Sequence, residues 1–194
     1  MARATLKAAS DRLPGAVAVD SSFLLAAIYD TDPRHGAAWP IYEQMVASGV
    51  TAVVCQPLLL IEAWNVLRRL ALDLSRDELR QMIEDSRERA IGQRALFRDP
   101  LPRSDAARRE YAMKAGEALL LTWLAPVPVA RVRLTYRLLA SAQRSMTRWG
   151  LRSHDATWLA VAQETARTVG GRPSLATVDD DFDRVDGLDV WGRR

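Results

Sequence analysis

Four carboxylates stand in positions where the surrounding sequence is apolar. Asp20 directly follows the apolar run 16–19, and Glu62 interrupts the sequence LLLIEAW. Asp155 opens the segment DATWLAVA, and Asp179 begins the acidic group that follows SLATV. Carboxylates that lie close together raise one another's pKa values, and such a group is stable mainly when a cation neutralises it. The residue types therefore predict an oxygen-donor site for Mg²⁺ or Mn²⁺, ions that activate water and stabilise charge on a phosphoryl group.

Short apolar runs that alternate with helical patterns must position these acids. Strands are expected at 16–19, 50–55, 174–178 and, as a last edge strand, 188–191. Helices are expected at 21–29, 34–48, 57–70, 133–149 and 153–168. This alternation predicts an α/β fold in which a parallel sheet is covered on both faces. Because ligands bind beyond the carboxyl ends of such strands, the acids after 16–19 and 174–178 are expected at one edge.

The length of 194 residues suits one well-packed domain. Residues 1–15 are expected to form a polar leader, and residues 16–194 are expected to form the domain. Within this domain, residues 71–125 are expected to form a helical excursion, an inserted segment of two helices. Ser75 and Glu78 form a capping-box pattern before a charged helix that ends near residue 97, and a second helix is expected at 105–123.

Composition excludes several classes of protein. The net charge of +3 permits a polyanionic partner without demanding one. A single cysteine, Cys55, rules out a disulfide within the chain, and with only two histidines it also rules out a zinc site of Cys and His ligands. No stretch has the ~20 apolar residues that a membrane span needs, and the N-terminal segment lacks a signal-peptide core. We therefore expect a cytoplasmic protein with no membrane partner.

Each acid also has a purely structural interpretation. Asp20 and the acids at 179–181 could cap helices, and Asp155 near a helix N-terminus would interact favourably with the helix dipole. Glu62 could face solvent, although its helix has few other polar positions before Arg68. The joint placement of the four acids favours a site more strongly than any one of them does.

A basic stripe precedes the third acid. No acid occurs between Ala118 and His154, whereas five arginines there follow spacings of 4, 7, 4 and 4, namely Arg133, Arg137, Arg144, Arg148 and Arg152. Such spacings place side chains along one helical face. The stripe is either a solvated basic face or a surface that follows RNA phosphates toward Asp155. On the second interpretation, substrate binding is assigned to Arg133, Arg137, Arg144 and Arg148.

The acidic segments together resemble the PIN domain family and, within it, the VapC-like toxin ribonucleases of type II toxin-antitoxin systems. They are AVAVDSSFLLA, QPLLLIEAWNVL, SHDATWLAVA and LATVDDDFDRV, in the order of the family, and the closing LDVW is also similar. The resemblance implies a three-layer α/β/α sandwich with a central, mostly parallel sheet. It also implies a ribonuclease that cleaves single-stranded RNA with Mg²⁺ or Mn²⁺.

The resemblance further implies roles for individual residues. It assigns four of them to catalysis and metal binding, namely Asp20, Glu62, Asp155 and Asp179. Asp181 matches an additional metal ligand, and Ser22 matches a small hydroxyl residue that holds substrate or the metal shell, although it could equally be a helix-start hydroxyl. The sequence DDD leaves open whether Asp180 replaces or assists its neighbours. Residues 71–125 make the chain longer than usual for this type of toxin.

Partners also follow from the resemblance. A toxin of this type has an antitoxin protein that covers its site, and it forms a homodimer through the early helices. The segment FLLAAIY and the helix at 57–70 are expected to supply exposed apolar surface for that dimer.

Two other functions compete with the metal-dependent endoribonuclease. The alternative from another class is a non-catalytic PIN-like module that binds RNA or protein, since fold alone does not establish activity. A phosphatase of the haloacid-dehalogenase type ranks third. Its chemistry requires a second Asp where this chain has Ser22, and a suitably placed Lys where the chain has only Lys7 and Lys114.

Overall fold

A single parallel sheet of six strands forms the centre of the molecule. The computed structural model describes residues 3–29, 32–73, 104–107, 109–110, 120 and 124–193, with the side chains of 67–73 left undescribed. The strands run in the order β1-β6-β5-β2-β3-β4, and every pairing is parallel. Their bounds are Thr5–Lys7 (β1), Ala16–Val19 (β2), Thr51–Val54 (β3), Val129–Arg131 (β4), Ser174–Ala176 (β5) and Asp189–Trp191 (β6).

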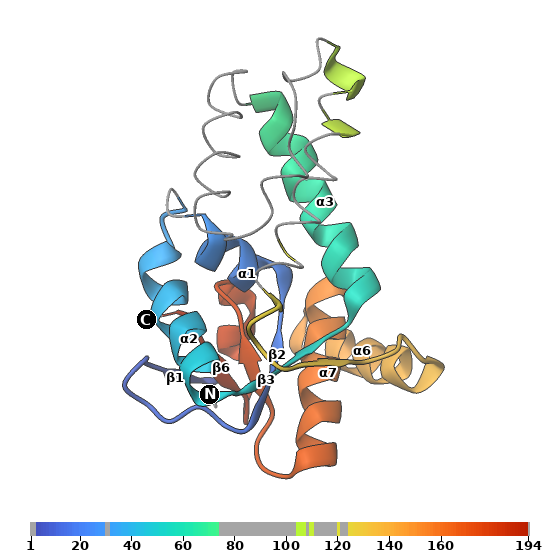
Figure 1. Cartoon of the computed structure of the whole chain (residues 1–194). Helices are drawn as coiled ribbons and strands as arrows, with labels where there is room; N and C mark the ends of the chain where they lie inside the picture. Colours follow the sequence, from blue (N-terminus) through green and yellow to red (C-terminus); the bar gives the residue numbers. More distant parts are fainter. Residues whose placement is uncertain are drawn as a thin grey trace.

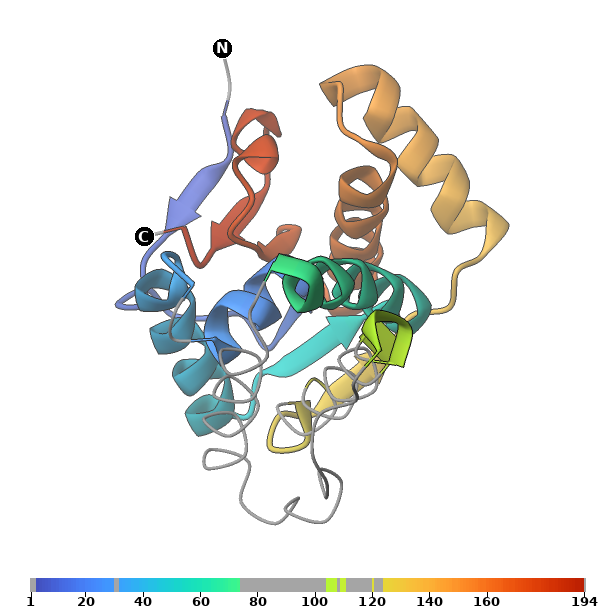
Figure 2. The same cartoon turned by 90° about the horizontal axis from the view of Figure 1, so that it is seen from above.

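Helices cover both faces of this sheet, as Figures 1 and 2 show. Helices α1 and α2 lie on one side and α6 and α7 on the other, while α3 rises from the end of β3 past the edge of the sheet (Figure 1). Their bounds are Ser21–Ile28 (α1), His35–Ser48 (α2), Gln56–Asp73 (α3), Tyr136–Trp149 (α6) and Ser153–Val169 (α7), with a 3₁₀ helix at Asp180–Arg184 (η1). The predicted α/β/α architecture is confirmed.

The apolar run 16–19 forms the strand that organises the sheet. Strand β2 lies between β3 and β5, and Val17, Ala18 and Val19 are fully buried. A continuous apolar run suits this position because helices cover a parallel strand on both faces. Ala18 lies opposite Val53 of β3 and Leu175 of β5. The carboxyl ends of these strands consequently reach the same edge, which brings the residues that follow them together.

The N-terminal segment belongs to the sheet, which corrects the expected boundary at Ala16. Thr5–Lys7 pairs in parallel with β6, with Leu6 opposite Val190. Strand β6 is therefore flanked by β1 and β5 and is not the edge strand that the sequence predicted. Alternation of apolar and polar residues cannot reveal a three-residue strand in a polar context, because its partner lies at the other end of the chain.

Helix α1 does not offer the exposed apolar surface that was expected for a dimer. Its six residues from Phe23 to Ile28 are each at most 5% exposed. The helix packs against α2 and α3, and these contacts bury its apolar side chains. On α3, Ile61 is 48% exposed, whereas Leu59 and Ala63 are buried. Of the two expected apolar surfaces, α3 alone retains an exposed large side chain among the described residues.

The predicted excursion at 71–125 lies largely outside the described residues. This holds for the whole of the charged helix that is expected after the Ser75 cap and ends near residue 97, and for most of the helix expected at 105–123. Within the part of the chain that the structure describes, no helix combines the length and the apolar character needed to cross a membrane.

Candidate functional site

A pocket of about 230 Å³ opens at the carboxyl edge of the sheet. Four separate elements contribute to it: the start of α1, the second turn of α3, the start of α7 and the loop after β5. Five predicted site residues line it, namely Asp20, Ser22, Glu62, Asp155 and Asp179. Side chains that are more than 100 residues apart in the sequence thus share one small space.

Asp20 is fixed by the helix that it begins. It is the N-cap of α1, and its Oδ1 accepts hydrogen bonds from the backbone N–H of Phe23 at 2.8 Å and from the hydroxyl of Ser22 at 2.9 Å. The residue is only 4% exposed. Burial raises the pKa of its carboxyl group to about 7, and the neighbouring charge of Glu62 adds to this rise. The capping interpretation is therefore correct for Asp20. The same carboxyl group is buried, however, so its ionised form costs folding free energy.

Glu62 enters the pocket from α3. Its Oε2 accepts hydrogen bonds from the hydroxyl of Ser21 at 2.6 Å and from the indole N–H of Trp158 at 2.8 Å. Its Oε1 lies 4.0 Å from Nδ1 of His154, whose side chain is more than half exposed. Burial raises the pKa of Glu62, and the charge of Asp155 acts in the same direction. Glu62 faces the pocket, which excludes the solvent-facing alternative.

Three further carboxylates lie close together, and two of them, Asp155 and Asp179, line the pocket. Asp155, Asp179 and Asp181 each place one oxygen within 4.8 Å of the others. Asp155 is nearly buried at the start of α7, and burial raises its pKa. Asp179 caps η1, and its Oδ1 accepts a hydrogen bond from the backbone N–H of Asp181 at 3.0 Å. Asp180 is exposed and stands outside this acidic trio, so the geometry favours Asp179 and Asp181 as its members.

A buried hydroxyl connects the two strand ends. Thr177, which follows β5, is fully buried, and its Oγ1 lies 3.3 Å from the hydroxyl oxygen of Ser22. The same Oγ1 accepts a hydrogen bond from the backbone N–H of Asp179 at 3.1 Å. Ser22 thereby joins the loops that carry Asp20 and Asp179, and its own hydroxyl proton is directed at Asp20. Its contacts in the structure are those of a residue that positions an acid.

Arg152 lies across the acidic trio. Its Nε donates to Asp155 at 3.1 Å, and its Nη2 donates to Asp179 at 3.2 Å and to Asp181 at 2.9 Å. The guanidinium side chain is nevertheless 69% exposed. Although Arg152 continues the spacing of the basic stripe, its charge is directed at the acids of the pocket.

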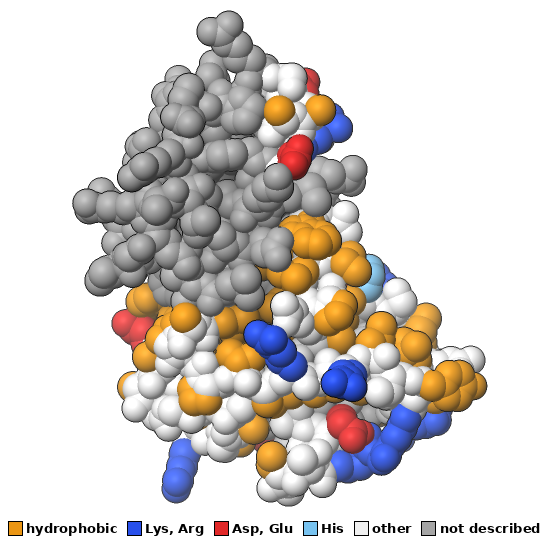
Figure 3. Space-filling model, turned by 45° about the vertical axis from the view of Figure 1, so that its right-hand side comes forward, with side chains coloured by type: hydrophobic (Ala, Val, Ile, Leu, Met, Phe, Trp, Pro, Cys, Tyr) orange, Lys and Arg blue, Asp and Glu red, His pale blue; other side chains and the backbone are white. Residues whose placement is uncertain are grey.

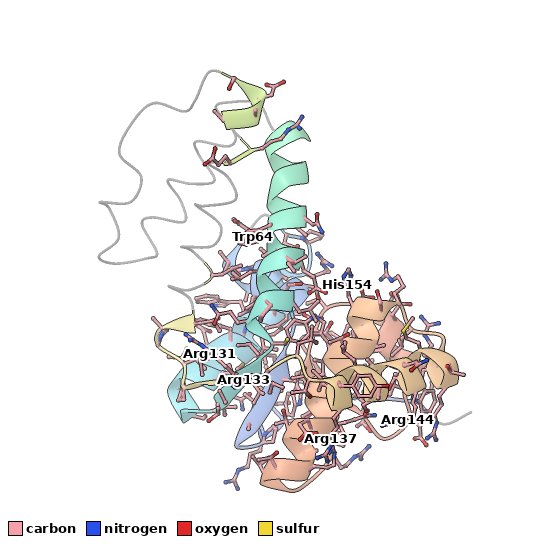
Figure 4. All side chains as sticks on the ribbon, turned by 90° about the vertical axis from the view of Figure 1, so that its right-hand side faces the viewer. Trp64, Arg131, Arg133, Arg137, Arg144 and His154 are labelled. Carbon is pink, nitrogen blue, oxygen red and sulfur yellow. The ribbon has the colours of Figure 1, made fainter. Side chains whose placement is uncertain are left out.

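The other arginines of the stripe stand outside the pocket. Arg133, Arg137, Arg144 and Arg148 are exposed, and within the described part of the chain none of them forms an ion pair. In Figure 4, Arg137 and Arg144 lie along α6 on the side away from His154, which marks the start of α7. In the space-filling view of Figure 3, Lys and Arg side chains gather at the lower right of the molecule.

Helix α6, which carries three arginines of the stripe, packs along α7. Ser141 of α6 donates a hydrogen bond to Gln163 of α7 at 3.1 Å, and both residues line a second pocket together with Arg144 and Arg148. Gln163 lies eight residues beyond Asp155 on the same helix, which corresponds to roughly 12 Å along its axis. Of the five arginines of the stripe, Arg152 alone lines the carboxylate pocket, whereas Arg144 and Arg148 line the second one.

The donor set fits a hard divalent cation. The acidic trio and Asp20 offer only carboxylate oxygens, which Mg²⁺ and Mn²⁺ prefer. Burial raises the pKa values of Asp20, Glu62 and Asp155, as expected for acids that lack a full positive counter-charge. The pocket is also roomy enough for an ion with some of its waters.

Sequence reasoning assigned no site role to three residues that the structure places at the site, namely Ser21, Trp158 and Thr177, and it placed Arg152 in the basic stripe and not among the acids. A signal existed for Trp158, which lies three residues after Asp155 and so on the same helical face. Nothing local marked Ser21 or Thr177, because both act through partners that are distant in the sequence.

A comparison with protein families gives one match. The model described as PIN domain matches residues 17–188, a span that begins in β2, ends directly before β6 and contains every acid of the pocket. No curated protein matches the chain.

Proposed function

This chain belongs to the PIN domain family, and from that membership we propose that it is a metal-dependent endoribonuclease that cleaves single-stranded RNA at the carboxylate pocket. PIN domains are generally nucleases. One observation supports the proposal above all: acids from four separate elements converge on one pocket at the carboxyl edge of the sheet. A purely structural role would not require buried acids to face one another, since their mutual repulsion destabilises the fold.

The acidic trio, together with Asp20, would hold Mg²⁺ or Mn²⁺. A divalent cation bound there supplies a Lewis acid that lowers the pKa of water and polarises the phosphodiester. Asp155 is held at the start of α7 and Asp179 at the start of η1, so both acids sit on rigid elements. Such fixed donors need little reorganisation when substrate binds.

Glu62 is the residue that we assign to proton transfer. Ser21 and Trp158 both donate to Oε2, so that oxygen is already engaged and Oε1 is the atom that accepts a proton from the attacking water. The raised pKa of Glu62 brings the carboxylate closer to the operating pH and makes it a better base than an exposed glutamate. Ser22 keeps Asp20 oriented through its hydroxyl group.

The exposed arginines Arg133, Arg137, Arg144 and Arg148 are proposed to bind RNA phosphates. They carry charge that no acid of the described chain neutralises, and phosphate contacts need no base recognition. Arg144 and Arg148 line the second pocket, so RNA bound there would contact α6 outside the carboxylate pocket.

We further propose that the nuclease is the toxin of a toxin-antitoxin pair, is cytoplasmic and forms a homodimer. The resemblance of the four acidic segments to VapC-like toxins supports this role. An antitoxin protein would then cover the open pocket. Induction of the wild type in a bacterial culture without antitoxin should arrest growth, whereas Asp20→Asn should not. Light scattering of the purified protein tests the dimer.

Cleavage of a panel of single-stranded RNAs by the purified protein in Mg²⁺, Mn²⁺ or EDTA tests the central proposal. Wild type and Asp20→Asn are compared with Asp180→Asn, which removes a neighbouring acid outside the trio. We expect cleavage that requires metal, disappears in Asp20→Asn and persists in Asp180→Asn. RNA binding without cleavage by folded wild type would instead favour a non-catalytic binding module.

A further inference from the structure

The positive charge at the acidic trio comes from the chain itself. Arg152 donates hydrogen bonds to one oxygen each of Asp155, Asp179 and Asp181, over distances of 2.9 to 3.2 Å. These three carboxylates are the ones whose oxygens lie within 4.8 Å of one another. The guanidinium group and a divalent cation would therefore compete for the same oxygens.

The backbone of Arg152 is held at the start of α7, and its side chain is largely exposed to solvent. Arg152 precedes α7 at the N-cap position, where its carbonyl oxygen accepts a hydrogen bond from the N–H of Ala156 at 2.9 Å and its side chain makes no capping bond. The side chain is 69% exposed, so water screens its ion pairs. A contact of this kind is weak enough for a divalent ion to displace it, although it keeps three carboxylates from repelling one another.

We propose that Arg152 is an internal counter-ion of the acidic trio, which neutralises Asp155, Asp179 and Asp181 until a divalent cation displaces its guanidinium group toward the RNA phosphate. This inference rests on the proposed nuclease function, because it assumes that the trio binds metal. After displacement, the guanidinium group and the metal ion repel each other, and the side chain turns to the mouth of the pocket, where its backbone anchor keeps it. An RNA phosphate is the ligand that attracts both charges.

The test measures Mn²⁺ affinity without RNA, by calorimetry or by the loss of the free-ion resonance signal. Arg152→Met removes the charge and keeps the aliphatic length. Since a unit charge beside a divalent ion at a hydrated site weakens its binding by about a factor of ten, we expect Mn²⁺ to bind Arg152→Met on the order of tenfold more tightly than wild type. Arg152→Lys, whose single ammonium cannot reach three carboxylates in a fork, should give an intermediate affinity.

Arg167→Met is the matched control. Arg167 lies on the same helix, is 44% exposed and pairs with Glu164, far from the pocket. Its replacement should leave the Mn²⁺ affinity unchanged. In a Glu62→Gln background that suppresses cleavage, labelled single-stranded RNA with Mn²⁺ should bind Arg152→Met several-fold more weakly, the opposite direction to the metal effect. A merely structural role for Arg152 cannot produce these opposite changes.

Two results would overturn the inference, and only the second would also overturn the proposed function. In the first, Arg152→Met binds Mn²⁺ as tightly as wild type or more weakly. Arg152 then forms only structural ion pairs, and the proposed metal site is unaffected. If neither protein binds Mn²⁺ and Asp155→Asn changes nothing, the trio is not a metal site and the proposed function fails with the inference.

Discussion

Replacing Asp20 by Asn should change how the stability of the metal-free protein depends on pH. Asn is itself a favourable N-cap, and its side-chain oxygen can accept the same two hydrogen bonds from Phe23 and Ser22. The substitution therefore removes the buried charge and leaves the cap of α1 in place. The difference in pH dependence between the two proteins then reports mainly the titration of this carboxyl group, with a smaller part from its coupling to Glu62.

The magnitude follows from the raised pKa. The Asp20 carboxyl group titrates near 3.8 in the unfolded chain and at about 7 in the native protein. Between these values the native state keeps a proton that the unfolded state has released, so the free energy of unfolding falls as the pH rises. Over the two pH units from 5 to 7, at about 1.4 kcal/mol per unit, the wild type should lose about 2 to 3 kcal/mol relative to Asp20→Asn.

Urea unfolding in EDTA at pH 5, 6, 7 and 8 measures this loss. The difference in unfolding free energy between Asp20→Asn and wild type should grow with pH and level off above pH 7. Asp180→Asn, which removes an exposed acid, should follow the wild type at every pH. Parallel profiles for wild type and Asp20→Asn would refute the reasoning, because they would show that burial does not hold a proton on Asp20.

Three further predictions test other parts of the structure. Glu62→Gln keeps an oxygen for both of its hydrogen bonds, so it should fold normally and lower the single-turnover cleavage rate by about 10²- to 10⁴-fold; an unfolded variant would contradict this. The double variant Arg144→Ala/Arg148→Ala loses two proposed phosphate contacts. The plot of log affinity for single-stranded RNA against log salt concentration, measured by fluorescence anisotropy, should therefore become shallower by about 1.4. An unchanged slope would show that α6 is not part of the RNA-binding surface. Gly192→Ala should destabilise the fold by more than about 2 kcal/mol in urea, because Gly192 has φ +89° and an added Cβ would lie 2.8 Å from Cδ2 of Phe23; wild-type stability would contradict that contact.

The sequence by itself determined four of the six strands and the edge at which the acids meet. The run 16–19 is apolar at every position, which suits a strand covered on both faces, and Asp20 and Asp179 follow the carboxyl ends of such strands. Because the strands are parallel, their carboxyl ends lie at one edge of the sheet. Residues that directly follow different strands therefore lie close together in space. Periodicity likewise predicted α6, which begins at Tyr136 and ends before Gly150.

Only the tertiary structure decided which neighbours these residues have. Spacing placed Arg152 in line with four exposed arginines, but it cannot say that Arg152 turns toward Asp155 and its neighbours while Arg144 lines a different pocket. For the same reason, the pattern of α1 showed an apolar helix without showing that α2 and α3 bury it. Helical and strand periods are properties of a few consecutive residues, whereas burial, ion pairing and pKa depend on side chains that distant segments bring into contact.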